Sequence, residues 1–200
     1  MTAAPTDDIA SIVIRERWAR DSCRWQTMRD CFHEDSVVDI SWVRSSGPEF
    51  VERSRASFEA GVRSVHVHGP VTVEREGDRA TADLGALVEI QFELHGVPCA
   101  LSAFARLVER LERRDAGGWR IAELRAVYHF DKLVAAIPGP QPAADPERIA
   151  RYRPSYRMLS HWVAETQGEG AVRHDLPGID RPDLVAALYD ENAAWLRGGG

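Results

Sequence analysis

The chain of 200 residues is 44% hydrophobic, which suits one globular domain with an appendage and excludes a disordered protein. Its net charge is −6 and acidic residues lie among its arginines, so there is no basic stripe for nucleic acid. No apolar run reaches the length of a membrane span, and the first residues lack a signal-peptide pattern. Three cysteines without a CxxC pair fit a reducing compartment, so we expect a cytoplasmic protein.

Hydrophobic residues at helical spacing predict three helices near the start of the chain. The first ends near Asp21, the second covers residues 25–32, and the third begins at Gly47. Between the second and third, residues 37–43 alternate as in a strand, with Trp42 on one of its faces.

Four longer runs then read as strands joined by tight turns at residues 76–78, 95–98 and 115–118. The runs are residues 62–74, 80–94, 99–112 and 119–130. The second alternates most clearly, with Ala80 to Phe92 presenting one small or apolar face. Short turns imply an antiparallel meander, so we predict an α+β domain whose helices cover one sheet face.

A proline-rich connector at residues 138–142 ends this unit, which we place at residues 1–137. Further helical patterns begin near Pro146, Ser155 and Pro182. About 60 residues are few for an independent core. We therefore expect residues 138–200 to form a helical extension docked on the first unit or on a neighbouring subunit.

His66 and His68 lie two residues apart in a strand-like run and should share a face. Asp21, at a predicted helix end, would orient an imidazole as a general base if it reached His66. The simpler alternatives are histidines with structural hydrogen bonds and an Asp21 paired with a neighbouring arginine. The HxH pair also fits one edge of a metal site, but no third ligand has suitable spacing, so we expect no metal.

Several short motifs follow one another in a recognisable order over residues 8–134. They are Trp18 to Asp21, Trp25, Arg29 to Asp39, His66, Gly77 to Ala80, and Gly118 to Ile121 leading to Tyr128. Together they resemble the SnoaL-like proteins of the nuclear transport factor 2-like superfamily. The resemblance implies a cone-shaped α+β fold or α+β barrel, in which three helices pack on a curved antiparallel sheet around a deep apolar pocket.

The scytalone dehydratase-like branch is the most similar, because it has an Asp–His dyad where Asp21 and His66 fall. This resemblance implies a carbon–oxygen lyase, related to dehydratases and a dehydrochlorinase, that needs no cofactor. It also implies a homo-oligomer, a trimer or a dimer. Glu16 is a departure, because dehydratases of this branch often have a tyrosine there, and whether Tyr128 or another group replaces it is open. The base of ketosteroid isomerases would fall at Ile40, which argues against that activity.

Six further residues are expected to line the pocket and bind substrate. They are His68, Trp42, Phe104, Leu124, Arg125 and Tyr128. Packing is the simpler interpretation for the aromatic residues, and an outward-facing charge is the simpler one for Arg125.

The function predicted from these observations is a dehydratase-type elimination on a small apolar aromatic, polycyclic or steroid-like substrate, with no nucleic-acid or membrane partner. One alternative is a hydrophobic-ligand-binding or accessory protein of the same fold. Another is a polyketide cyclase or an epoxide hydrolase. Those enzymes need inward carboxylates, and the predicted inward strand faces show few of them.

Overall fold

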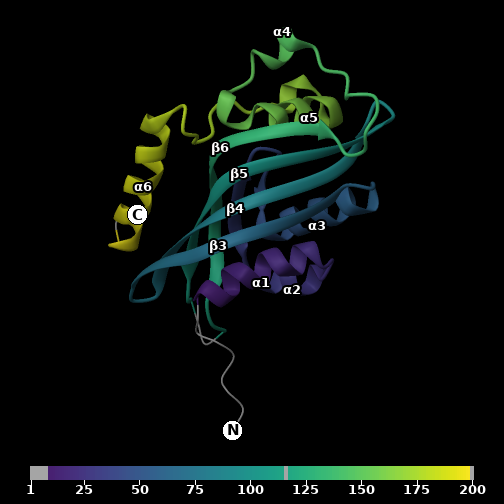
Figure 1. The fold of residues 1–200 in the computed structure, drawn as a ribbon. Helices are drawn as coiled ribbons and strands as arrows, with labels where there is room; N and C mark the ends of the chain where they lie inside the picture. The colour runs from purple at the N-terminus through teal and green to yellow at the C-terminus, as the bar shows by residue number, and fades with distance from the viewer. Residues whose placement is uncertain (1–8, 115–116, 199–200) are drawn as a thin grey trace.

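The structure is a computed structural model that describes residues 9–114 and 117–198 (Figure 1). The first unit contains α1 (Ile9–Asp21), α2 (Trp25–Asp30), β1 (Phe32–Ile40), β2 (Val43–Ser46), α3 (Gly47–Glu59), β3 (Arg63–Glu76), β4 (Arg79–Leu94), β5 (Val97–Glu112) and β6 (Arg120–Ala135). The C-terminal segment contains α4 (Pro146–Ile149), η1 (Pro154–Tyr156), α5 (Arg157–Gln167), η2 (Glu169–Ala171) and α6 (Pro182–Leu196). Residues 115–116 of the third predicted turn lie outside the described residues.

The strands form one six-stranded curved sheet in the order β2-β1-β6-β5-β4-β3, which confirms the α+β class. The meander from β3 to β6 is antiparallel as predicted. However, β1 pairs with β6 in parallel, so the expectation of a purely antiparallel sheet is wrong. The meander alone would leave unpaired backbone groups along the outer edge of β6, and β1 pairs with that edge. Because β2 and β3 form opposite edges, the sheet is open and the expected barrel does not form.

The first strand starts earlier than the sequence predicts. It begins at Phe32, which the helical spacing assigns to the second helix, whereas that helix ends at Asp30. The backbone N–H of Ile121 donates to the carbonyl of Cys31 at 2.8 Å, and Phe32 pairs with Ile121. The register then shifts before Val37, and this irregularity hides the beginning of the strand from a test for simple alternation.

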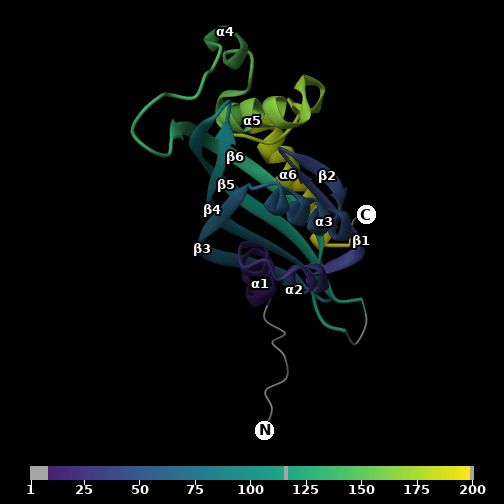
Figure 2. The ribbon, with the colours of Figure 1, turned by 90° about the vertical axis from the view of Figure 1, so that its right-hand side faces the viewer.

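Helices α1, α2 and α3 lie together against one side of the sheet, while α6 lies on the other side (Figures 1 and 2). The predicted alternation of β4 is confirmed, since Ala82, Leu84 and Ala86 are buried in the core between sheet and helices. On the neighbouring strands the same inner face carries Ala103, Ala105 and Ala126. Such small side chains fill little volume, which leaves space under the helices.

The C-terminal segment packs directly on the sheet. Tyr156 and Leu159 belong to the main hydrophobic core, and the N–H of Leu159 donates to the carboxylate of Asp131 on β6 at 2.7 Å. Helix α5 starts at Arg157 because Pro154 begins a 3₁₀ turn, so Ser155 is not its cap. On the opposite face of the sheet, Leu188 of α6 packs in a separate small cluster.

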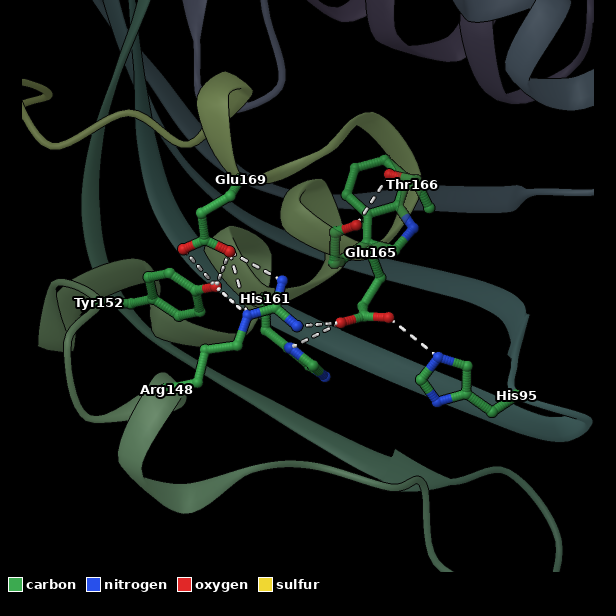
Figure 3. A network of polar contacts seen from close by, with 8 residues as sticks. His95, Arg148, Tyr152, His161, Glu165, Thr166 and Glu169 are labelled. Carbon is green, nitrogen blue, oxygen red and sulfur yellow. Dashed lines mark hydrogen bonds and ion pairs between the residues drawn. The ribbon is translucent and has the colours of Figure 1, made fainter.

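A polar network links α4, α5 and the turn between β4 and β5 (Figure 3). Glu165 of α5 accepts from Nε2 of His95 at 2.9 Å and pairs with the guanidinium of Arg148 on α4. Arg148 also pairs with Glu169 at 2.8 Å, and the hydroxyl of Tyr152 donates to the same carboxylate at 3.0 Å. These contacts fix the position of α5, which contributes Leu159 and Trp162 to the wall of an internal cavity.

Candidate functional site

A cavity lies between α1, α3, α5 and the inner face of the sheet. Its empty volume is about 710 Å³, counting the open mouth. The apolar part of the wall includes Ile40, Trp42, Phe50, Val88, Leu124 and Trp162. The polar part consists of Arg17, Arg20, Ser41, Ser57, Ser64, His66 and Tyr128. An apolar pocket with a few convergent polar groups is the usual form of a small-molecule site.

His66 and Asp21 are in contact at one side of this cavity. Nδ1 of His66 lies 2.7 Å from Oδ1 of Asp21, and the backbone N–H of His66 donates to Oδ2 at 2.7 Å. The carboxylate at the end of α1 therefore holds both the ring and the backbone of β3. Because an ionised carboxylate only accepts hydrogen bonds, Nδ1 carries the proton and the lone pair of the ring is on Nε2.

The surroundings keep this imidazole neutral and this carboxylate ionised. Burial lowers the pKa of His66 to about 3, the nearby Arg20 and Arg17 add to the effect, and Asp21 opposes it. Burial alone would raise the pKa of Asp21, but its hydrogen bonds with His66 lower that pKa below its usual value. At neutral pH the site thus contains a neutral base next to a carboxylate.

We expect His66 to stay neutral while an exposed histidine titrates near a pKa of roughly 6.5. Its folded-state pKa lies below its unfolded-state pKa, so the unfolded chain binds more protons between these two values. Its contribution to stability is therefore lost as the pH falls from about 6.5 towards 3. An NMR titration of the His66 ring in the folded and in the urea-unfolded protein checks this, and a midpoint near 6.5 in the folded protein would contradict it.

Of the six expected pocket residues, three line the cavity and three do not. Trp42, Leu124 and Tyr128 line it. Phe104 lies on the outer sheet face, where its ring stacks on Phe130 with centroids 4.5 Å apart. Its neighbours Ala103 and Ala105 point inward, and a strand alternates, so our placement of Phe104 in the pocket is corrected.

The alternation of β6 places Arg125 on the outer face in the same way. It points outward between Leu124 and Ala126 and pairs with Glu191 of α6 at 2.8 Å. Our expectation that it binds substrate is corrected for this reason. His68 lies beside the dyad rather than in the cavity wall, with its ring 6.1 Å from that of His66. Its buried Nε2 has no hydrogen-bond partner among the described residues.

Sequence reasoning missed a group of buried charges beside the cavity, of which Arg17 lines the wall. Glu16 and Arg17 are 0% and 2% exposed and form an ion pair through Nε and Nη2 of the guanidinium. Glu109 of β5 is also fully buried, and burial, aided by Glu16, raises its pKa to about 8. A signal was available, because Glu16 and Arg17 continue the buried stripe of α1 that contains Ile12 and Val13.

Arg20 follows on the same helix and lines the cavity. Its Nη1 donates to the hydroxyl of Ser64 at 2.6 Å, and its Nε donates to the hydroxyl of Ser54 at 3.3 Å. The guanidinium also lies 6.0 Å from the ring centroid of Trp42. Burial lowers the pKa of Arg20 to about 10, so the side chain is still charged at neutral pH.

Tyr128 brings a phenol to the cavity from β6. Its oxygen accepts the backbone N–H of Ser41 at 2.7 Å, and burial raises its pKa to about 12. The phenol therefore keeps its proton and is able to donate it. Within the described ranges, no group of three His, Cys, Asp or Glu side chains is placed to hold a metal ion.

The sequence-family model that describes the SnoaL-like domain matches residues 2–125 of the chain. The chain belongs to the SnoaL-like family. Its sheet and helices show the NTF2-like fold that the resemblance implied. None of the helices in the described part of this SnoaL-like protein has the length and apolar character that crossing a membrane requires.

Two fungal relatives of this SnoaL-like protein come from Fusarium vanettenii. A PEP2-like protein is 32% identical over 198 residues, covering 92% of this chain and 83% of the relative. Pea pathogenicity protein 2 is 29% identical over 196 residues, with the same coverage of both chains. Among solved structures, the hexachlorocyclohexane dehydrochlorinase LinA-type3 of Novosphingobium barchaimii superposes with a TM-score of 0.54 at 15% identity. That match covers 69% of this chain and 92% of the dehydrochlorinase, and it shows a shared fold.

Proposed function

We propose that this SnoaL-like protein is a cofactor-independent lyase that removes water from a small apolar ring compound. His66 is the general base and Asp21 is its orienting partner. The observation that supports this most is the 2.7 Å contact between Nδ1 of His66 and Asp21, on an imidazole that lines an apolar cavity. Elimination begins with removal of a proton from carbon, and a neutral imidazole with a fixed tautomer is suited to that step.

Each dyad residue has a distinct role in the proposal. Nε2 of His66 accepts the proton, and the ionised Asp21 stabilises the imidazolium that results. General-base catalysis contributes about 10²- to 10⁴-fold, so the cavity must supply more by holding the C–H bond against Nε2. The protonated phenol of Tyr128 is the group that we assign to the leaving oxygen, in place of the tyrosine absent at Glu16.

The wall of the cavity supports an apolar ring as the substrate. Trp42, Phe50 and Trp162 present aromatic surface, and alanines on the sheet leave the space free. Loss of chloride in place of water is the second leaving-group option, since a structural neighbour is named a dehydrochlorinase. The cavity wall contains no carboxylate among the described residues, which disfavours a cyclase or an epoxide hydrolase with carboxylate chemistry.

A homo-oligomer and a cytoplasmic location stay predictions. The outer sheet face supports the first, because Val67, Leu87, Phe104 and Phe130 lie side by side across four strands. Val67 and Phe130 are 61% and 52% exposed, and a row of this kind is typical of an interaction surface.

We expect that incubating the protein with a panel of hydroxylated aromatic, polycyclic and steroid compounds converts one of them. Mass spectrometry should then find a product that is lighter than its substrate by the mass of one water. The Asp21→Asn variant should still bind the responsive compound and lose about 10²- to 10⁴-fold in turnover, because the imidazolium loses its counter-charge. If compounds bind tightly, none is converted and Asp21→Asn binds equally well, the protein is a ligand-binding member of the family instead.

A further inference from the structure

The two arginines in the cavity wall differ in how their charges are satisfied. The guanidinium of Arg17 is paired with the carboxylate of Glu16. Arg20 donates hydrogen bonds instead to two hydroxyls, those of Ser54 and Ser64. The adjacent Asp21 directs both of its oxygens to His66. Arg20 is thus a cation of the wall that forms no direct ion pair with a carboxylate of the described residues.

Arg20 and His66 face the same space. Both line the cavity, and Ser64, which accepts from Nη1 of Arg20, lies two residues before His66 on β3. Side chains two residues apart on a strand point to the same face. A substrate atom at Nε2 of His66 therefore has the guanidinium of Arg20 as a neighbouring cation.

We propose that Arg20 binds a carbonyl oxygen of the substrate and stabilises its negative charge while His66 removes the proton from the adjacent carbon. This inference rests on the proposed lyase function and narrows its substrate class. The substrate is a β-hydroxy ketone or ester on an apolar ring, in which the C–H bond next to the carbonyl is broken.

The step balances without any further reactant. The Cα–H bond breaks, its proton goes to Nε2 of His66, and its electron pair moves to the carbonyl oxygen beside Arg20 as an enolate. The enolate then forms the Cα–Cβ double bond while the Cβ–O bond breaks. The departing oxygen receives a proton, from the imidazolium directly or through Tyr128 with the imidazolium restoring the phenol. One water leaves and the site returns to its starting state.

Electrostatics gives a reason why the substrate must have a carbonyl. Burial and the nearby arginines make His66 a weak base, so an unactivated C–H bond would not yield its proton. The positive charge of Arg20 disfavours an imidazolium at His66 when no negative charge forms nearby. The same cation favours an imidazolium–enolate pair when the new negative charge forms on the oxygen that it contacts, because fixed charges aimed at developing charge lower the barrier.

The experiment uses 2-naphthol as a probe, since its ionised form resembles a ring enolate, and naphthalene as the matched compound without oxygen. Fluorescence titration measures both affinities, and the naphtholate spectrum measures the pKa of bound naphthol. We expect the wild-type protein to prefer 2-naphthol and to lower its pKa. Arg20→Met should weaken 2-naphthol binding by about 10- to 100-fold and leave naphthalene unchanged, as expected for loss of a charged hydrogen bond. Arg20→Lys should retain part of the preference.

Arg24→Met is the control, because Arg24 is exposed and lies over Trp18 on the surface. Whether or not Arg20→Met folds, equal affinity of the wild-type protein for the two compounds overturns the inference. An Arg20→Met protein that binds 2-naphthol as tightly as wild type also overturns it. If elimination depends on His66 but 2-naphthol is not preferred, the proposed lyase function holds and the proposed role of Arg20 is wrong. If 2-naphthol is preferred through Arg20 but no elimination is found, Arg20 is an oxygen-binding residue and the proposed lyase function is wrong.

Discussion

Replacing His66 with alanine is expected to reduce turnover towards the upper end of the about 10²- to 10⁴-fold range of a general base. The variant loses the only imidazole among the described residues of the cavity wall. It should keep its fold, because the backbone N–H of residue 66 still donates to Asp21 and continues to join α1 to β3. Single-turnover kinetics on the compound found in the panel, together with circular dichroism, measures both effects.

His68→Ala is the matched control for this variant. It removes the same ring from the same strand face, but from a side chain that lies outside the cavity wall. We expect it to change turnover only a few-fold. Equal activity in a folded His66→Ala protein would refute the mechanism, and an equal loss in both variants would point to damage to β3 instead of loss of a base.

The largest effect on stability is expected from Arg17→Met. This change leaves the carboxylate of Glu16 buried without its partner and next to Glu109, which has no hydrogen-bond partner among the described residues. Breaking a buried ion pair from one side costs about 3–5 kcal/mol in the free energy of unfolding. Urea denaturation of the wild-type and variant proteins measures the difference.

Two further variants separate this explanation from a simple packing effect. The double variant Glu16→Leu with Arg17→Met removes both charges and should recover most of the lost stability, because an apolar pair of similar volume is tolerated in a core. Arg53→Met breaks an exposed pair with Glu49 and should change stability by about 0.5 kcal/mol or less. A double variant as unstable as Arg17→Met would show that the buried charges are not the cause.

Local patterns predicted much of this molecule. The alternation of β4 identified its buried face, and Pro182 marked the first residue of α6. The contact between Asp21 and His66 was anticipated although 45 residues separate them. It came from the order of family motifs and not from any periodicity, because periodicity contains no information about which helix end meets which strand.

Other features depended on partners that the pattern does not specify. Alternation shows that Phe104 and Ala105 face opposite sides, but which side is inside depends on where α1 and α3 pack. In the same way, β1 was a predictable strand, but local pattern does not specify which of the two edges of the meander, β3 or β6, it joins, or that it joins β6 in parallel. That Glu109 of β5 is fully buried next to Glu16 and Arg17 likewise depends on how α1 packs on the sheet.

The amino-acid order alone thus determined most of the helices and strands, because those depend on side chains a few positions apart, but not the start of β1 or the separate strand β2. The three-dimensional packing decided which faces enclose the cavity and which charges share it. The chemistry that we propose depends on the second kind of information. Burial and neighbouring charge control the proton affinity of His66 and the proposed role of Arg20. The burial and the neighbouring charge both result from the packing of α1 against β3.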